Sequence, residues 1–310
     1  MHQKKDILTI IIPLKGRDYA TKRILDQMSS DKVPFKVLLA DGSGEDKSHL
    51  FSSLQYPILD LVYINFGKDN TVNDFMNKLH RVTSLVDTPF TVLIDNDDIV
   101  SLEGLHFATN FLSNNEEYVS FRGALLERGT NKNYHSSKCS IIHNTIFDRV
   151  STDLIGKDAA WQDVTRTSVI KKLYELLFKS RTEDLMLTFT IDSSFRLIYG
   201  KNHRDFDQPL VYHISGDSLV FGRSDWFGYK GWFKSPHIND SLGLYVSTIS
   251  NAISKKDGIP LEIAKKEFSE FLVGDICDNS VIDVNKKDKV VTAIDMSNKY
   301  DSLVNTILWE

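Results

Sequence analysis

The residues with the clearest potential for chemistry are three aspartates within four positions, Asp95, Asp97 and Asp98, directly after the apolar residues Val92-Leu93-Ile94. Carboxylates this close repel one another unless a positive charge neutralises them. Mg²⁺ and Mn²⁺ prefer oxygen ligands and often bind one or two carboxylates together with substrate phosphates. The cluster is therefore interpreted as a metal site for a leaving diphosphate. A polar turn ahead of a helix capped by Ser101 would also account for it.

Two further acidic sites stand at the ends of predicted elements. Asp41 follows an apolar run and precedes Gly42-Ser43, where its carboxylate could accept a hydrogen bond from the ring N–H of a base such as uracil. A simple Asp-Gly-Ser turn is the commoner explanation for that motif alone. Glu183 and Asp184 stand at the start of a predicted helix. One of them could be a general base for a hydroxyl, or both could only complement the helix dipole.

His213, after Leu210-Val211-Tyr212, is a further candidate metal ligand, because imidazole suits Mn²⁺ better than Mg²⁺. A single histidine at a strand end is more often structural, and both interpretations stay open. The aromatic segment Trp226–Phe233 could stack on sugar faces, although packing against other helices is the commoner role for such rings. The same two alternatives apply to Trp161.

The first hundred residues alternate short apolar runs with helical patterns, which predicts a parallel α/β sheet. In such a sheet, ligands bind where the loops at the carboxyl ends of the strands converge. Asp41 and the Asp95–Asp98 cluster are therefore expected at one edge of the sheet. The expected strands are Ile7–Pro13, Phe35–Ala40, Asp60–Phe66 and Phe90–Asp95, and the expected helices are Arg17–Ser29, Thr71–Val86 and the segment after Ser101.

The pattern changes after Tyr118, and from about Asn239 to the end it is mostly helical. We expect a catalytic domain over residues 1–235 and a mainly helical extension over residues 236–310, which could bind the acceptor, a partner domain or a second copy of the chain. Between Tyr118 and Asn239 the expected strands are Tyr118–Arg122, Leu125–Arg128, Ser140–Ile142, Phe195–Tyr199 and Leu210–Ile214, and the expected helices are Trp161–Ser180 and Glu183–Ile191.

The composition is that of an ordinary globular protein. The chain has 310 residues, of which 41% are hydrophobic and 25% charged, and its net charge of −5 gives no attraction to nucleic acid or to anionic membranes. Two cysteines without Cys-x-x-Cys spacing indicate free thiols in a reducing compartment. No segment approaches the roughly 18 uninterrupted apolar residues of a transmembrane helix. A cytoplasmic enzyme without a transmembrane segment is expected.

Taken in order, four motifs resemble those of the family-2 glycosyltransferases. They are Ile10-Ile11-Ile12-Pro13 followed by Arg17, Ala40-Asp41-Gly42-Ser43, Ile94-Asp95-Asn96-Asp97-Asp98, and Glu183-Asp184. The similarity covers about residues 7–215. It implies the GT-A fold, which is a mainly parallel mixed sheet flanked by helices. It also implies a nucleotide-diphosphate sugar as donor, a divalent metal (Mn²⁺ or Mg²⁺) as cofactor, and usually inversion at the anomeric carbon.

The resemblance also implies roles for individual residues. Asp95 would face the ribose or the sugar, and Asp97 would ligate the metal, with His213 as the late histidine that completes the metal site in some related enzymes. Asp184, or else Glu183, would be the catalytic base. In the nucleotide pocket, Pro13 and Arg17 would flank the nucleotide and Asp41 would hold the base.

Three departures from the family pattern leave the identity of the nucleotide open. Ala40 stands where the family often has an acid, and Gly16 stands where it usually has asparagine. The family's Gly-Gly-x-x-x-Ala-Arg-Asn stretch has no clear counterpart, since Asn65-Phe66-Gly67 to Asn77-Lys78 occupies that region.

Two other functions remain as alternatives. A nucleotidyltransferase also combines an α/β sheet with acidic metal ligands, but it would normally carry a glycine-rich basic loop after the first strand. Pro13-Leu14-Lys15-Gly16-Arg17 is only a faint version of such a loop. A nucleotide-sugar-binding module without catalysis is the second alternative, because of the departures at Ala40 and Gly16. If the chain is a transferase, the acceptor would be a glycan, a lipid-linked precursor or a protein.

Overall fold

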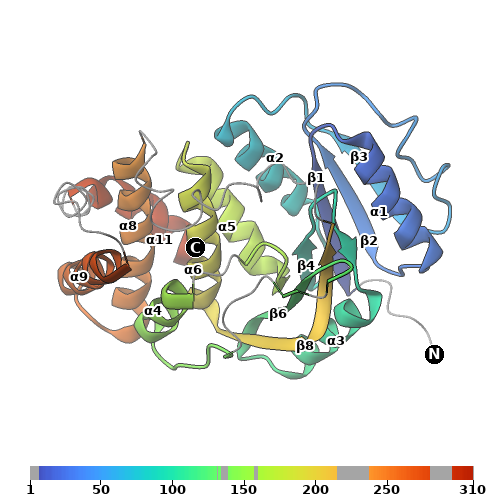
Figure 1. Ribbon diagram of the computed structural model, residues 1–310. Coiled ribbons are helices and arrows are strands. Elements are labelled where there is room, and N and C mark those ends of the chain that lie inside the picture. Colours follow the sequence, from blue (N-terminus) through green and yellow to red (C-terminus); the bar gives the residue numbers. More distant parts are fainter. Residues whose placement is uncertain are drawn as a thin grey trace.

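The computed structural model describes residues 7–130, 132–133, 139–156, 160–214, 237–279 and 295–309. Among these residues, eight strands form one sheet in the order β3-β2-β1-β4-β7-β6-β8-β5, with helices on both faces (Figure 1). The aromatic segment Trp226–Phe233 lies outside the described residues, and so does the expected domain boundary near residue 235.

The N-terminal half of the sheet is parallel, as the alternating pattern predicts. The chain runs from β1 outward to β2 and β3, and then returns to the other side of β1 as β4. The strand order therefore reverses between β1 and β4, and ligands of open α/β sheets bind at the carboxyl ends of the strands at such a switch point. The bounds are β1 (Leu8–Leu14), β2 (Lys36–Asp41), β3 (Asp60–Asn65) and β4 (Phe90–Leu93).

The remaining strands form a mixed half. The strand β7 is antiparallel to both β4 and β6, whereas β8 is parallel to β6 and antiparallel to β5. The sequence did not predict β5 and β7, because strands of two and three residues are too short to show a period. The two strands expected over residues 118–128 are one continuous strand. The bounds are β5 (Ile99–Val100), β6 (Tyr118–Glu127), β7 (Val164–Arg166) and β8 (Lys201–His213).

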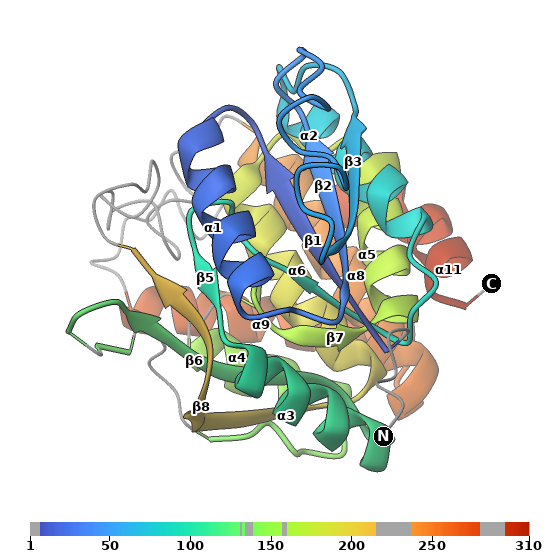
Figure 2. The same ribbon diagram turned by 90° about the vertical axis from the view of Figure 1, so that its right-hand side faces the viewer.

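Strand β1 shows how the two faces are built. Ile10 packs in a cluster with Leu25 of helix α1, whereas Ile11 packs in a second cluster with Leu79 of helix α2. Successive side chains of a strand point to opposite faces, so a strand covered on both sides is apolar throughout. In Figure 2, α1 and α3 lie in front of the sheet, and α5 and α6 lie behind it. The bounds are α1 (Asp18–Ser30), α2 (Val72–Ser84), α3 (Leu102–Asn114), α5 (Thr167–Lys179) and α6 (Leu185–Tyr199).

One predicted segment is wrong in type, and another is wrong at its start. Phe195–Tyr199, expected as a strand, forms the last turns of α6, where Phe195 continues the buried face of Leu187 and Ile191 at a spacing of four. The predicted helix Trp161–Ser180 begins only at Thr167, because the residues before it pair with β4 and β6 as β7. Long-range pairing of this kind leaves no local signal. The segment Ser140–Ile142 was also expected as a strand. Within it, Ile141 makes an isolated β-bridge with Asn202.

Helix α4 (Ile146–Gly156) was not predicted, although the sequence carries two signals for it. Ile146 and Val150 are buried at a spacing of four. The side chain of Thr145 accepts a hydrogen bond from Asp148 N at 3.1 Å, which is a typical helix start.

The C-terminal part is helical, as expected. Its helices are α8 (Ile238–Asp257), α9 (Leu261–Asn279) and α11 (Asp301–Trp309), with the short 3₁₀ helix η1 (Asn298–Tyr300) before α11. Leu242 and Ile249 of α8 belong to the same apolar cluster as Ile191 of α6. The separate extension over residues 236–310 stays a prediction. No helix in the described part of the chain is both long and apolar enough to span a bilayer.

Candidate functional site

A pocket of about 440 Å³ opens at the carboxyl ends of β1 and β4, the switch point of the sheet. Three of the residues predicted to contact a nucleotide or its sugar line this pocket, namely Pro13, Arg17 and Asp95. Its other walls come from the loop before α2, from α2 itself and from Leu185 at the start of α6. The pocket therefore lies where the topology of the sheet predicts a ligand.

Three basic side chains, Lys15, Arg17 and Lys78, line this pocket. The Lys78 side chain is only 2% exposed, and its Nζ donates to Asp69 Oδ2 at 2.5 Å and to Leu14 O at 3.2 Å. Burial lowers the pKa of Lys78, while the nearby Asp69 carboxylate opposes that shift. Lys15 Nζ donates to the backbone carbonyl of Asp69. Asp69 and Asp95 line the same pocket, so its lining carries charges of both signs. The basic side chains among them are groups that can donate hydrogen bonds to phosphate oxygens.

Lys78 is a candidate site residue that the sequence interpretation missed. The available signal was its position three residues after Phe75, on the face of the predicted helix that carries the apolar residues. A lysine on an apolar helix face needs a buried counter-charge, and Asp69 supplies it.

Gly42, in the second motif, makes room for Asp69. A Cβ atom at position 42 would lie 2.0 Å from Asp69 Oδ2, far inside van der Waals contact. The Asp69 carboxylate that holds Lys78 can thus stay in place only if residue 42 has no side chain.

We expect Gly42→Ala to lower the free energy of unfolding by about 1–3 kcal/mol, the range for inserting a methyl group into a well-packed site. The new methyl group would displace Asp69 and with it Lys78. Urea unfolding at pH 7 measures the change. Gly274→Ala is the matched control, because a Cβ at this helical position meets nothing within 4 Å. Equal stability of Gly42→Ala and the wild type would contradict the steric argument.

The predicted base-binding residue Asp41 is fully buried and is not part of the pocket lining. Its Oδ1 accepts a hydrogen bond from Ser43 N, and its Oδ2 accepts one from Tyr63 Oη, both at 2.7 Å. Burial and the hydrogen bond to Asp41 raise the pKa of Tyr63 above its usual range. These contacts make Asp41 part of the Asp-Gly-Ser turn. Its contact with a nucleotide base stays a prediction.

The acid cluster after β4 contacts two basic side chains from distant parts of the chain. Arg17 Nη1 donates to Asp97 Oδ2 at 2.5 Å, and His213 Nδ1 lies 2.8 Å from Asp98 Oδ1. The hydrogen bond to Asp98, with the charges of Asp97 and Asp95, raises the pKa of His213, although burial opposes this shift. Protein groups therefore offset part of the repulsion that the sequence interpretation assigned to a metal ion alone.

Asp95 lies between the pocket and the protein interior. Its Oδ1 accepts a hydrogen bond from Trp161 Nε1 at 3.1 Å, and its Oδ2 lies 3.5 Å from Gln162 Nε2. Burial, followed by the charges of Asp98 and Asp97, raises the pKa of Asp95 to about 8. Trp161 itself is largely buried and packs against aromatic rings of α2 and α6, so packing is its main role.

The two candidate bases differ in position. Asp184 is buried and is the N-cap of α6, where its Oδ1 accepts a hydrogen bond from Leu187 N at 3.0 Å. Its Oδ2 is also buried and has no hydrogen-bond partner among the described residues. Glu183 is exposed, whereas Leu185, the residue after Asp184, lines the pocket. Neither Asp184 nor Glu183 lines the pocket itself, and the choice of catalytic base stays a prediction.

A divalent metal held by Asp97 and His213 stays a prediction. In the described ranges, no group of three or more His, Cys, Asp or Glu side chains is arranged to hold an ion alone. Mg²⁺ and Mn²⁺ sites in phosphate-binding proteins often use one or two protein ligands and complete the shell with phosphate oxygens. The hydrogen bond from His213 to Asp98 is of the kind that orients metal-binding imidazoles.

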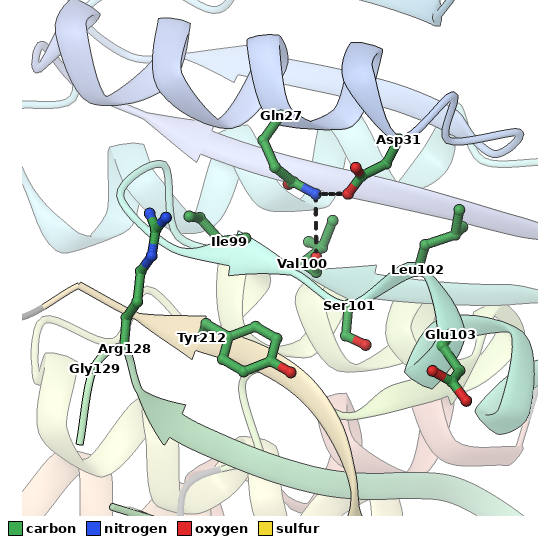
Figure 3. A pocket seen from close by; sticks show the side chains of 10 residues that line it. All are labelled: Gln27, Asp31, Ile99, Val100, Ser101, Leu102, Glu103, Arg128, Gly129 and Tyr212. Atoms are coloured by element: carbon green, nitrogen blue, oxygen red, sulfur yellow. Dashed lines mark hydrogen bonds between the residues drawn. The ribbon is translucent and has the colours of Figure 1, made fainter. Parts of the chain in front are cut away.

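A second pocket, of about 500 Å³, is lined by residues of β5 and β8, the start of α3 and the end of α1 (Figure 3). Ile99 and Tyr212 belong to its lining, whereas their chain neighbours Asp98 and His213 contact each other and do not. None of the predicted site residues lines this second pocket. The first pocket is therefore the candidate functional site.

No protein-family model and no curated protein sequence matches this chain. Its structure is similar to that of S. aureus TarS, with a TM-score of 0.58 at 12% identity over 97% of this chain and 52% of TarS. It is also similar to S. aureus TarS 1-349 in complex with UDP-GlcNAc, with a TM-score of 0.58 at 15% identity over 97% of this chain and 83% of that one. The chain thus spans about half of the longer TarS chain. The predicted GT-A fold is confirmed.

Proposed function

We propose that this chain is a glycosyltransferase that moves a sugar from a nucleotide-diphosphate donor to an acceptor hydroxyl. The observation that carries the proposal is the pocket at the β1–β4 switch point, whose lining includes basic side chains from the loop after β1 and from α2, together with Asp95 of the acid cluster. The GT-A fold and the similarity to TarS, whose complex with UDP-GlcNAc is known, support the same function.

The pocket supplies groups for the diphosphate and the sugar of such a donor. Lys15, Arg17 and Lys78 would meet the negative charge of the diphosphate, and Asp95 would accept hydrogen bonds from hydroxyl groups of the ribose or the sugar. Pro13 would pack against the nucleotide. Recognition of the base by Asp41 stays a prediction, because this side chain is buried and lies outside the pocket lining.

Asp97 and His213 would hold a divalent metal, which when bound supplies positive charge to stabilise the departing diphosphate. The imidazole favours Mn²⁺ over Mg²⁺ at this position. Asp98 would keep the His213 ring oriented through the hydrogen bond at Nδ1.

In the proposed reaction, Asp184 accepts the proton of the acceptor hydroxyl. The acceptor oxygen forms a bond to the anomeric carbon, the bond from that carbon to the diphosphate oxygen breaks, and the nucleoside diphosphate leaves with the electron pair. A single displacement of this kind inverts the anomeric configuration. The class of acceptor, a cytoplasmic location and dimerisation through the C-terminal helices stay predictions.

A ligand panel tests the proposal directly. We expect the melting temperature to rise with nucleotide sugars of one base, and to rise further when Mn²⁺ is added together with that nucleotide. A ligand present at a hundred times its dissociation constant adds about 2.7 kcal/mol of stability. UDP-glucose, UDP-GlcNAc and GDP-mannose are the probes, each with and without Mn²⁺, and Mn²⁺ alone is the control.

The same panel separates the alternatives. Release of nucleoside diphosphate from the stabilising donor supports a transferase, whereas binding without release would identify a non-catalytic module. Pyrophosphate release from nucleoside triphosphate and sugar phosphate would instead identify a nucleotidyltransferase. If none of the nucleotide sugars raises the melting temperature, the proposal is wrong.

A further inference from the structure

Asp95 is held by the turn that precedes β7. Both contacts of its carboxylate, from Trp161 Nε1 and Gln162 Nε2, come from neighbouring residues of this turn. The turn is closed by a hydrogen bond from Asp163 N to Ala160 O at 3.0 Å. The orientation of Asp95 at the pocket thus depends on where this short segment sits.

A buried group of charged and polar residues fixes the turn at Asp163. Arg122 Nε donates to Asp163 Oδ1 at 2.8 Å, and Arg122 Nη2 donates to Asp163 Oδ2 at 3.1 Å. Asn202 Nδ2 donates to the same Oδ2 at 3.2 Å. Arg122, Asp163 and Asn202 are each only 2% exposed and come from β6, the turn and β8. Asp163 therefore ties the turn to two neighbouring strands.

The geometry of this arrangement is more specific than net stability alone would select. Buried ion pairs recover little net stability, because the desolvation of both charges offsets most of their attraction, and apolar residues of similar volume often serve as well. A two-pronged Arg–carboxylate contact does, however, fix both the position and the orientation of its partners. Loss of the Asp163 anchor would leave Trp161 and Gln162 free to shift, and Asp95 would lose its fixed orientation.

We propose that Asp163 is a positioning residue, which acts through Trp161 and Gln162 to set the orientation of Asp95 at the donor pocket. The role of Asp95 towards the donor rests on the proposed function, whereas the mechanical link from Asp163 to Asp95 does not.

The link can be tested without any substrate. In protein with ¹⁵N-labelled tryptophan, the indole N–H signal of Trp161 is identified by its loss in Trp161→Phe, among the four tryptophans of the chain. Asp163→Asn is expected to shift this signal upfield and to speed its exchange with water, because the hydrogen bond to Asp95 is loosened. An unchanged Trp161 signal in folded Asp163→Asn overturns the proposal.

The control removes a comparable ion pair elsewhere. Asp301→Asn breaks the contact of the buried Lys265 among the C-terminal helices, and it should leave the Trp161 signal in place. If Asp163→Asn does not fold, Asn202→Ser provides the second variant. It removes the amide that contacts Asp163, Ser120 and Arg204, and it leaves the Arg122 contact with Asp163 in place. Asn202→Ser should shift the Trp161 signal in the same direction as Asp163→Asn. An unchanged signal would contradict the proposed link from Asp163 to Asp95.

With an active donor in hand, kinetics extends the test. Asp163→Asn should raise KM for the donor by about tenfold, the worth of one hydrogen bond to a charged group, with a smaller change in kcat. The double variant Asp163→Asn/Trp161→Phe should be no worse than the poorer single variant, since both act on one hydrogen bond. Additive losses would mean that Asp163 acts independently of Trp161. The NMR test of the link does not depend on whether the chain is a transferase.

Discussion

Asp97→Asn is expected to lower the rate of sugar transfer by about 10²–10³-fold while the protein stays folded. Loss of one group that stabilises charge in a transition state has an effect of this size. Asparagine has nearly the same shape and keeps an oxygen that can accept the hydrogen bond from Arg17, so the local contact survives. What disappears is the negative charge that would hold a divalent metal. Steady-state transfer at saturating Mn²⁺, with circular dichroism to monitor folding, measures both parts.

Asp87→Asn is the control for this result. Asp87 precedes strand β4, which Asp97 follows. The Asp87 side chain is 77% exposed, and it contacts Lys36 rather than the pocket. It should retain full activity. Robust turnover by Asp97→Asn would reject the assignment of this residue to a metal site, and unfolding of the variant would show that the Arg17 contact is mainly structural.

Asp184→Asn is the second variant for which we expect a large loss, about 10²–10⁴-fold in kcat, the usual contribution of a general base. This substitution removes the charge of residue 184 and can keep its contact with the helix. Asparagine caps helices about as well as aspartate, so the hydrogen bond from Leu187 N can be kept and α6 should remain intact. Loss of activity without loss of stability would therefore report on the proton acceptor. Thermal unfolding of the variant gives the second measurement.

Glu183→Gln is the matched control, since it removes a charge from the adjacent but exposed side chain. We expect kcat to stay close to the wild-type value, because the exposed Glu183 side chain does not line the pocket. The reverse outcome, an inactive Glu183→Gln and an active Asp184→Asn, would transfer the role of base to Glu183. Two active variants would leave neither residue as the base.

The parts of the fold that the sequence predicts are those with a local period. The apolar run from Ile7 to Pro13 is a strand covered on both faces, and the spacing of Phe75, Leu79 and Val82 is that of a helix on a sheet. Pro13 lies within β1, and Asp95 follows β4. Both line the pocket because parallel strands end at the same edge of the sheet. This placement needs no tertiary information beyond the order of the elements.

Contacts between distant segments could not be predicted in this way. Arg17 and Asp97 are 80 residues apart, and His213 and Asp98 are 115 residues apart. Whether a carboxylate meets a metal, an arginine or a histidine depends on which loops the sheet brings together. Local patterns carry no such information, so the sequence interpretation assigned the whole counter-charge to a metal ion.

The backbone at Gly16 bears on one difference from the sequence pattern that the chain resembles. Gly16 has a φ of 72°, in the left-handed region, which glycine adopts freely and asparagine enters more readily than most other residues. Glycine and asparagine therefore both suit the backbone turn that leads to Arg17. Ala40, by contrast, is fully buried among apolar residues, including Ile11 and Leu38, so an acid at this position would face an apolar cluster.

The pairing of β5 with β8 bears on the order of events during synthesis. In the described sheet β5 is the outermost strand, and its partner residues Val211 and Tyr212 lie more than a hundred positions later in the chain. A nascent chain that ends before β8 already contains Arg17, the partner of Asp97, but it cannot bring His213 to Asp98. The acid cluster therefore gains its second basic partner only after residue 213 has emerged from the ribosome.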